Sequence, residues 1–394
     1  MMDFLKLSAT DISLIDYFRN HNLLEWVKSE DRINLFDKEV IKTKTIKQYK
    51  GILFCFYSKR IDILFKPHYY FNNNLHNAND FQIADCINTI LELKSTFEID
   101  LKSLKVVNIE FGINVLSPIC IKKLIAYLLY QERNEFKTVP GLAFCKMSFK
   151  SKSDGTVNKY KIFKAYAKGI QFPEFADIDT FRIEIKSRES KYVKKLGIYT
   201  ANDLLNFDCY LNMSNKLLEE WKKVLLIDNV TDFSNLTTNE QAKIKEYLNS
   251  ITWFDISQDP YKNKFNKERG KYYKLVDKNP NNLKNILTKI ISDKLEYLKN
   301  GYISTQNDIK IKAIQNSKTS SVSTQNKIKN KAFEKNKSGY ISNIYKVGNV
   351  TTTETETTIK NDEVEKPLLI YKEQKISIAE YNCLAVQNYN SRYG

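Results

Sequence analysis

Histidine and cysteine are scarce in this chain of 394 residues. It has three histidines, His21, His68 and His76, and six cysteines, no two of which form a C-x-x-C pair. The cysteine spacings fit neither a zinc ribbon nor a disulfide framework, which excludes the common zinc modules and the small disulfide-bonded scaffolds. Cys55 and Cys145 stand beside phenylalanines and are predicted to be small core residues. This cysteine usage indicates a reducing cytoplasm.

Long apolar runs and the common nucleotide and hydrolase motifs are also absent. No stretch of about 18 apolar residues occurs, and the first residues lack the pattern of a standard signal peptide, so neither a membrane span nor secretion is predicted. The chain contains no P-loop, G-x-G-x-x-G, G-x-S-x-G or H-E-x-x-H sequence. Without them an ATPase, a nicotinamide enzyme and a common hydrolase lose support.

Basic residues, in contrast, are in excess. Lys and Arg number 62 against 46 Asp and Glu, a formal net charge of +16, and +11 of this excess falls within residues 1–300. A basic balance favours a polyanionic partner such as DNA, RNA or an acidic membrane surface. The alternative is codon drift, because Lys, Asn and Ile are all encoded by AT-rich codons and such drift raises the pI without any function.

The order of predicted elements indicates the α+β class. Hydrophobic periodicity predicts strands at residues 51–57, 61–71, 106–115, 141–149, 159–168 and 181–186. It predicts helices at residues 11–28, 80–97, 118–131, 190–196, 201–207, 213–226, 238–252 and 281–298. Strands that cluster before a run of helices argue against a doubly wound parallel sheet.

This order divides the chain into four predicted segments. They are an N-terminal helical segment at 1–48, a sheet-based domain at 49–190, a helical region at 191–300 and a largely disordered tail at 301–394. The tail is rich in Ser, Thr, Asn, Gln and Lys, a composition that buries too little apolar surface to offset the entropy of ordering.

The strand from Val106 to Val115 has one wholly apolar face. Because side chains alternate along a strand, the other face carries Asn108, Glu110, Gly112 and Asn114. A carboxylate, two amides and a glycine suit a reaction floor that closely approaches a ligand. A half-exposed strand with a solvated polar face is the simpler alternative.

A second strand, from Asn158 to Lys168, carries a tyrosine and lysines on one face. Tyr166 and Lys168 are two residues apart and so point the same way, with Tyr160 and Lys164 on the same face. A phenol is a plausible nucleophile for a phosphodiester, and a neighbouring ammonium would favour the phenolate. With 24 tyrosines in the chain, an ordinary strand tyrosine is the alternative.

The strand from Phe181 to Arg188 places Glu184 between cations. Arg182, Glu184 and Lys186 share a face, so Glu184 is either a metal ligand or a member of a cross-strand ion pair. A hard divalent cation bound by carboxylates and one imidazole is feasible, and His68 at the end of the second strand is the candidate imidazole.

These segments together resemble a known family. In the replication initiation factors of small plasmids and of filamentous or other single-stranded-DNA phages, a strand with Y-x-K-G precedes a strand with R-x-E. The chain matches this pattern with Tyr160–Gln171 and Phe181–Lys186, while Asn108–Asn114 is similar to the central acidic strand and Leu196–Leu205 to the segment after the last strand. The resemblance covers about residues 50–230.

The resemblance implies the mechanism of HUH-type nicking enzymes. In these a five-stranded antiparallel sheet with flanking helices holds Mg²⁺ or Mn²⁺, the metal polarises a phosphate of origin DNA, single-stranded or hairpin, and a tyrosine attacks it. The 5′ phosphate stays on the tyrosine and the free 3′ hydroxyl primes synthesis. The bacterial host cytoplasm and a host replication helicase are the implied location and further partner.

Roles carry over residue by residue. Tyr166 is the implied nucleophile, and Lys168, the second implied catalytic residue, is expected to contact the phosphate, as is Arg182. The expected metal ligands are Glu110, Glu184 and His68, and the expected DNA contacts are Arg182, Lys164, Lys186, Asn114 and Tyr160. A later segment, Tyr261 to Lys274, interleaves basic and aromatic residues and is either a nucleic-acid surface or a solvated loop.

Two departures from the family pattern keep alternatives open. The His-hydrophobic-His triplet is absent, with Glu110-Phe-Gly in the comparable strand, and Ala167 stands where an acidic residue is common. A non-catalytic DNA-binding protein on the same fold is therefore the alternative function. Tyr160, six residues before Tyr166, is the alternative nucleophile.

Overall fold

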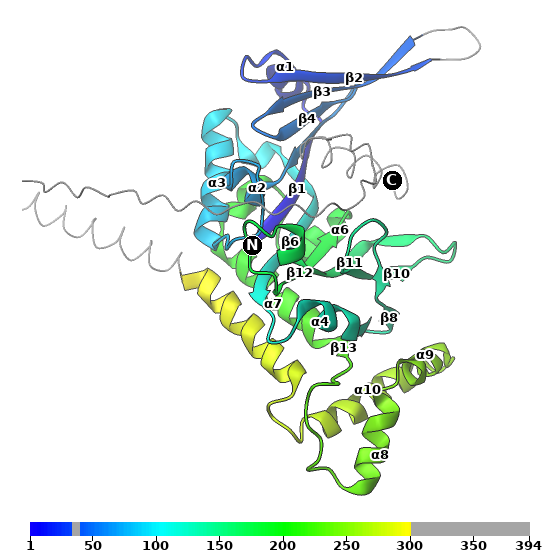
Figure 1. Cartoon of the computed structure of the whole chain (residues 1–394). Helices are drawn as coiled ribbons and strands as arrows, with labels where there is room; N and C mark the ends of the chain where they lie inside the picture. The colour runs from blue at the N-terminus through cyan, green and yellow to red at the C-terminus, as the bar shows by residue number, and fades with distance from the viewer. Residues whose placement is uncertain (34–39, 301–394) are drawn as a thin grey trace, which may run out of the picture. The chain divides into compact units, whose positions relative to one another are not determined.

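A ten-stranded antiparallel sheet dominates the computed structural model, which describes residues 1–33 and 40–300 (Figure 1). In spatial order its strands are β2 (Glu25–Ile33), β3 (Val40–Tyr49), β4 (Ile52–Phe56), β5 (Ile61–Phe65), β1 (Met2–Ala9), β6 (Lys105–Leu116), β12 (Thr180–Ser187), β11 (Val157–Ala167), β10 (Cys145–Ser151) and β9 (Lys137–Thr138). A small second sheet contains β13 (Val224–Leu226), β7 (Leu128–Gln131) and β8 (Asn134–Glu135). The predicted α+β class is confirmed, with ten strands in the main sheet in place of five.

The helices lie between and after these strands. They are α1 (Ile12–Asn20), α2 (Pro67–Phe71), α3 (Ile83–Thr96), α4 (Ile121–Tyr127), α5 (Lys168–Gln171), α6 (Ser190–Lys195), α7 (Phe207–Lys222), α8 (Thr238–Tyr247), α9 (Ser250–Gln258), α10 (Lys262–Val276) and a helix at residues 283–300. Short 3₁₀ turns occupy Leu101–Ser103 and Ala201–Leu205. Within the described ranges, none of these helices combines the length and apolar character that crossing a membrane requires.

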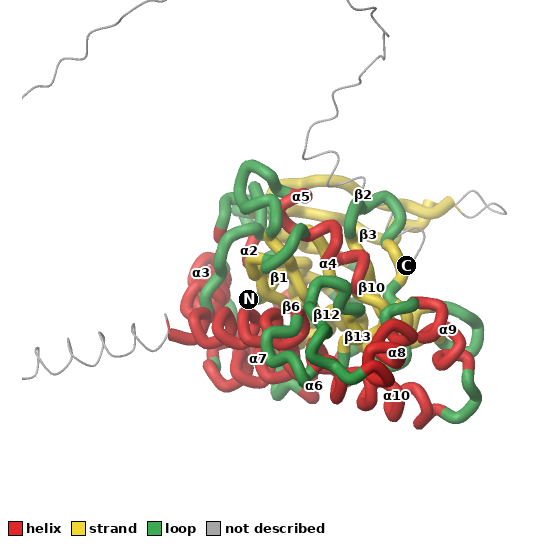
Figure 2. The backbone as a smooth tube through the Cα atoms, turned by 60° about the horizontal axis from the view of Figure 1, so that its bottom comes forward, coloured by secondary structure: helices red, strands yellow, loops and turns green. Residues whose placement is uncertain are grey.

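The apolar face of the central strands carries the main core. Phe111 and Ile113 of β6, Ile183 and Ile185 of β12 and Phe163 of β11 are fully or almost fully buried. Apolar side chains of α3, α6, α7 and the helix at 283–300 pack in the same cluster, and Figure 2 shows α3, α6 and α7 along one side of the strands. This burial leaves the opposite face of the same strands available for polar side chains.

The N-terminal segment differs from its prediction. Residues 1–48 were expected to be helical, but they form β1, the short helix α1 and the long strands β2 and β3. Asp11 does cap α1, its carboxylate accepting from the backbone N–H of Leu14 at 3.1 Å. The alternation of Leu5 and Leu7 with Lys6 and Ser8 is the strand signal that applies there.

The predicted boundaries at residues 48 and 190 do not separate independently packed parts. One core cluster contains Leu7 of β1, Ile183 of β12, Leu217 of α7 and Leu287 of the later helix. The described residues, 1–33 and 40–300, belong to one compact unit. The predicted tail at 301–394 lies outside the described residues.

Two predicted elements end earlier than expected. The strand predicted at 61–71 stops at Phe65, because Pro67 occupies the first position of α2, where its missing N–H is not needed. The helix predicted at 118–131 is α4 followed by β7. The first of these changes places residues 67–71 near the polar face of the central strands.

The segment from Tyr261 to Lys274 is mostly the amphipathic helix α10, so the solvated loop is wrong, and the nucleic-acid surface stays a prediction. Phe265 and Tyr272 are buried in a second core cluster together with Trp253 of α9, so they are not free for base stacking. Tyr261 is exposed, as are Lys267 and Lys274.

Candidate active site on the polar face of the sheet

Strands β6, β12 and β11 bring most of the predicted site residues onto one face. The register pairs Lys164 with Glu184 and Tyr166 with Arg182 between β11 and β12. Between β12 and β6 it pairs Arg182 with Asn114, Glu184 with Gly112 and Lys186 with Glu110. The predicted sharing of a face by these residues is confirmed.

Glu184 is the centre of this face. It is 2% exposed, and its carboxylate accepts hydrogen bonds from the Lys164 ammonium, from the Tyr166 hydroxyl at 2.9 Å and from Arg182 Nε at 3.2 Å. Burial alone would raise the pKa of the Glu184 carboxyl, but the charges of Lys164 and Arg182 hold that pKa well below its ordinary value. Glu184 is therefore an ionised hydrogen-bond acceptor.

Arg182 is sealed inside the protein. Its side chain is 1% exposed, and besides Glu184 it donates to Asp3 of β1 and to Asn114 Oδ1 at 2.6 Å. With its nitrogens engaged in this way, Arg182 positions Glu184 and does not reach DNA. This corrects the prediction that Arg182 is a phosphate contact.

Asn114 also has an internal role. Its amide nitrogen donates to the carbonyls of Asn77, Ala78 and Asn79, at 3.3, 2.9 and 3.1 Å. It therefore ties the loop before α3 to the sheet, which differs from the DNA contact predicted for it. Gly112 likewise serves packing, since a Cβ there would lie 2.6 Å from Glu184 Cβ.

Lys168 lies beside Tyr166 at the end of β11. Its ammonium is 5.4 Å from the centre of the Tyr166 ring and 4.4 Å from that of Phe172, and it donates to Asn77 and, at 3.0 Å, to Gln171. Lys168 is 1% exposed, and this burial lowers its pKa to about 7. Lys168 is therefore buried beside the tyrosine ring and is not a surface cation.

Tyr166 is half-buried with its hydroxyl on a carboxylate. Burial and the neighbouring Glu184 charge raise the pKa of this phenol well above its ordinary value. The sequence pattern predicted that lysines would favour the phenolate; the direct acceptor is Glu184, so the phenol is the resting form. A tyrosine hydroxyl that donates to a buried carboxylate has the geometry that a nucleophile beside a general base requires.

The three expected metal ligands are not gathered together. Glu110 forms an ion pair with Lys186, and Glu184 accepts from Lys164 and Arg182. His68 contacts Asp3 at 3.4 Å and Asn79 at 2.8 Å, and burial lowers its pKa to about 3. Among residues 1–33 and 40–300 no three His, Cys, Asp or Glu side chains cluster as metal ligands. Carboxylates already paired with ammonium groups do not fit a divalent cation.

Tyr160 lies away from the side chains around Glu184. We call this group the Glu184 cluster; it comprises Asp3, Lys164, Tyr166, Lys168, Arg182 and Glu184 with the residues that they contact. A register shift between β10 and β11, at Phe149 and Ser151, interrupts the alternation before Tyr160. Its ring packs 5.3 Å from Tyr192 of α6, against the main core, and Lys195 lies over it at 5.6 Å. The structure thus places the alternative nucleophile and DNA contact outside the Glu184 cluster.

The sequence did not predict three residues of the cluster: Asp3, Asn77 and Tyr69. Asp3 lies at a register irregularity of β1, between Met2 and Phe4, and reaches Arg182 across 179 residues of sequence. Asn77 bridges Asp3 and Lys168. The alternating pattern of β1 could have indicated a strand, but no local signal gives its position between β5 and β6.

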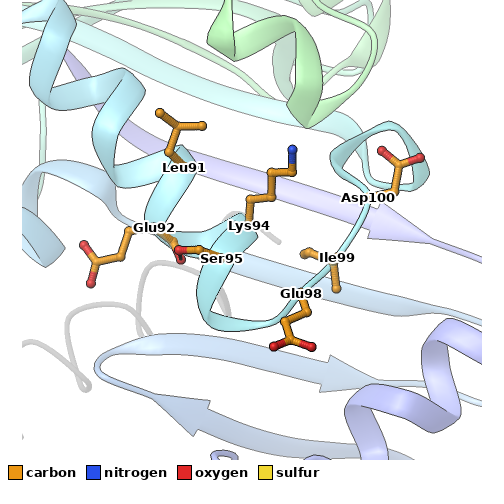
Figure 3. A pocket seen from close by; sticks show the side chains of 7 residues that line it. All are labelled: Leu91, Glu92, Lys94, Ser95, Glu98, Ile99 and Asp100. Atoms are coloured by element: carbon orange, nitrogen blue, oxygen red, sulfur yellow. Dashed lines mark hydrogen bonds between the residues drawn. The ribbon is translucent and has the colours of Figure 1, made fainter. Parts of the chain in front are cut away.

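A separate hollow lies at the C-terminal end of α3 (Figure 3). Its volume is about 880 Å³ and it is lined by Leu91, Glu92, Lys94, Ser95, Glu98, Ile99 and Asp100. None of these residues belongs to the Glu184 cluster, and their mixed charges and apolar groups present no converging set of catalytic side chains.

Comparison with known proteins gives little. No family model and no curated protein sequence matches the chain. Among solved structures, the chain is similar to "Structure of Rolling Circle Replication Initiator Protein from Geobacillus stearothermophilus", with a TM-score of 0.34 and 10% sequence identity over 69% of this chain and 95% of that chain.

Proposed function

We propose that the chain is a rolling-circle replication initiator that nicks origin DNA with Tyr166. The observation that carries this proposal is the 2.9 Å hydrogen bond from the Tyr166 hydroxyl to Glu184, a buried carboxylate held by Lys164 and Arg182. Nucleophile, base and orienting group thus follow one another in hydrogen-bond contact, the arrangement that activates a weak nucleophile.

The proposed reaction forms one bond and breaks one. The Tyr166 oxygen attacks the phosphorus while its proton passes to Glu184, and the bond from phosphorus to the 3′ oxygen breaks. The 3′ oxygen takes a proton from water, and the 5′ phosphate stays on Tyr166 as a phosphodiester. Lys168 stabilises the charge that develops on the phenol oxygen, because its ammonium lies 5.4 Å from the ring centre.

The balance of charge on this face suits a phosphate. Four basic side chains, Lys164, Lys168, Lys186 and Arg182, face three carboxylates, those of Asp3, Glu110 and Glu184. Lys164 and Lys186 are the partly exposed cations, with side-chain exposures of 18% and 12%. They are the side chains that would meet the phosphate oxygens, as predicted for DNA contacts.

A covalent-capture assay tests the proposal. The protein is mixed with labelled single-stranded and supercoiled DNA that carries the flanks of its own coding region, and a protein–DNA band is sought after denaturation. We expect the band with the unmodified chain and with Tyr160→Phe, and its loss with Tyr166→Phe. A band that persists in Tyr166→Phe and disappears in Tyr160→Phe would show that the nucleophile is misassigned.

The assay is run with Mg²⁺, with Mn²⁺ and with a chelator, because the family resemblance implies a metal. We propose a metal requirement on that ground alone, and no step above passes through a metal. A host replication helicase as partner, acting on the strand freed by the nick, and action in the bacterial cytoplasm complete the proposal.

One observation favours a second function, non-catalytic DNA binding on the same face. The Glu184 carboxylate already holds three donors, and the raised pKa of Tyr166 opposes formation of the phenolate. In that case the same DNA binds without a covalent band, and the affinity falls steeply as salt rises. The capture assay separates the two functions.

A further inference from the structure

A second tyrosine reaches the Glu184 cluster from outside the three strands. Tyr69 belongs to α2, the single helical turn that follows β5, and the sequence offered no reason to include it. Its phenol is close enough to Glu184, Lys164 and Tyr166 to interact electrostatically with each of them. The cluster therefore contains two phenols, supplied by different parts of the chain.

The neighbouring residues fix the position of Tyr69. Pro67 starts the turn, and His68 points inward to Asp3 and Asn79, where it is 1% exposed. The Tyr69 carbonyl accepts from the backbone N–H of Asn72 at 3.0 Å and of Asn74 at 2.7 Å. A turn anchored through a buried side chain and two backbone bonds holds the next side chain in a defined direction.

Ring contacts connect Tyr69 to Tyr166. The Tyr69 ring lies 6.3 Å from that of Phe172 in an edge-to-face arrangement. Phe172 in turn lies 4.4 Å from the Lys168 ammonium, which is 5.4 Å from the centre of the Tyr166 ring. Phe172 and Lys168 therefore connect the Tyr69 ring to the Tyr166 ring by consecutive contacts.

The Tyr69 hydroxyl lacks an acceptor. It makes no hydrogen bond within the described part of the chain, although it is half-buried, and burial together with the Glu184 charge raises its pKa to about 12. Glu184 already accepts from Lys164, Tyr166 and Arg182. A protonated hydroxyl that is only half-buried and has no acceptor among the described residues is free to donate to a ligand oxygen.

We propose that the Tyr69 hydroxyl donates a hydrogen bond to a non-bridging oxygen of the DNA phosphate that Tyr166 attacks. This inference rests on the proposed function. A phosphate oxygen is an acceptor that this hydroxyl can use, and the contact would strengthen as negative charge grows on that oxygen in the transition state. Tyr69 forms no covalent bond, because the carboxylate base is bonded to the hydroxyl of Tyr166.

The variant Tyr69→Phe tests this contact. Removing one hydroxyl that donates to a charged oxygen should slow single-turnover formation of the covalent band about 10- to 100-fold. The substrate is the single-stranded oligonucleotide recovered from the capture assay. Tyr70→Phe is the matched control, because Tyr70 is on the same turn but donates to Glu92 at 2.5 Å, and its rate should equal that of the unmodified chain.

A modified substrate identifies the atom. Each of the two methylphosphonate isomers at the scissile position replaces one non-bridging oxygen with a methyl group. We expect the penalty of Tyr69→Phe to vanish with one isomer and to persist with the other. Thermal unfolding of Tyr69→Phe should match the unmodified chain, because the hydroxyl has no partner to lose in the free protein.

The outcomes are distinct. If Tyr69→Phe reacts as fast as the unmodified chain, or if its penalty is the same with both isomers, the contact with the phosphate oxygen does not exist. If the unmodified chain forms no covalent band with any of these DNAs, the proposed function fails and this inference fails with it.

Discussion

The polar face of the central strands and the helices α8 to α10 are both rich in basic and aromatic residues, but they arrange them in opposite ways. On the sheet the charges are inside: Arg182, Lys168 and Glu184 are each at most 2% exposed. In α10 the aromatic rings of Phe265 and Tyr272 are inside, and the side chains of Lys264, Lys267, Lys271 and Lys274 face solvent.

The difference separates a region with a buried ion network from a region with a buried aromatic core. Buried ions are costly to desolvate, and a buried ion network is seldom the most stable filling for its volume. A helix with buried rings and solvated lysines is the usual stable solution. The desolvation free energy of buried ions therefore opposes folding at the Glu184 cluster, where the ions orient Tyr166. No such cost arises from the solvated lysines of α10.

The largest expected effect comes from replacing one arginine in each of the two regions, Arg182 on the sheet and Arg269 in α10. Arg182→Met leaves Asp3 and Glu184 without their shared cation, and unpairing a buried ion costs about 3–5 kcal/mol. Arg269 of α10 donates to the Lys223 carbonyl at 2.8 Å, so Arg269→Met should cost about 0.5–1.5 kcal/mol, the value of one hydrogen bond. Denaturant unfolding measures both free energies.

The pH dependence of this difference checks its cause. In the folded chain the pKa of Glu184 is depressed, so its contribution to stability is present above its unfolded pKa of 4.5 and is lost as the pH falls through its folded pKa. The destabilisation by Arg182→Met should therefore shrink in acid, where Glu184 becomes protonated in the variant. Equal destabilisation by the two arginine variants at neutral pH would contradict the comparison.

A smaller effect is expected from the charge of Lys168. Its pKa of about 7 means that its ammonium is present below that pH and lost as the pH rises through it. Formation of the covalent band should slow with this loss, and Lys168→Met should be about 10-fold slower than the unmodified chain near pH 6, the value of a cation beside a ring. Above pH 8 the two rates should converge.

Stability should respond to pH in the opposite direction. The folded pKa of Lys168 lies below its unfolded value of 10.5, so the unfolded chain binds more protons between them and the free energy of unfolding rises with pH in that window. Lys146→Met is the control, because burial also lowers the pKa of Lys146 but its ammonium donates to the carbonyls of Ala126 and Leu128. If the rate of covalent-band formation depends on pH in Lys168→Met as it does in the unmodified chain, Lys168 takes no part in the reaction.

Period-two alternation was enough to predict much of the Glu184 cluster. Glu110, Lys164, Tyr166 and Glu184 share a face in the structure because the side-chain direction in a strand depends only on position along it. Their partners required knowledge of distant pairing. Asp3 reaches Arg182 because β1 lies between β5 and β6, an order that no local pattern indicates.

The errors have local physical causes. Tyr160 does not lie on the predicted face, because the pairing of β10 with β11 shifts between Phe149 and Ser151. His68 and Tyr69 were assigned to a strand that Pro67 ends. In α10 the interleaved aromatic residues were expected to be available for nucleic acid, but a helical period places Phe265 and Tyr272 seven residues apart on the buried face.

The smallest expected effect concerns the lysines that α10 leaves exposed. Lys267 and Lys274 lie two turns apart on one face, and neither has an ion-pair partner within residues 1–33 and 40–300. If both meet phosphates, replacing them with Gln should reduce the slope of log affinity against log salt by about 1.4 for single-stranded DNA. Tyr166→Phe protein is used, so that binding is measured without covalent capture.

The matched control replaces Lys264 and Lys271, which are also exposed in α10 but are paired with Asp259 at 2.6 Å and with Glu268 at 2.7 Å. A cation already paired releases fewer DNA counterions on binding, so the slope should change less than with Lys267 and Lys274. An equal change in both pairs would mean that only the net charge of α10 matters. No change in either would make α10 a packing module alone and leave DNA recognition to the sheet, the sharpest form of the contrast between the two regions.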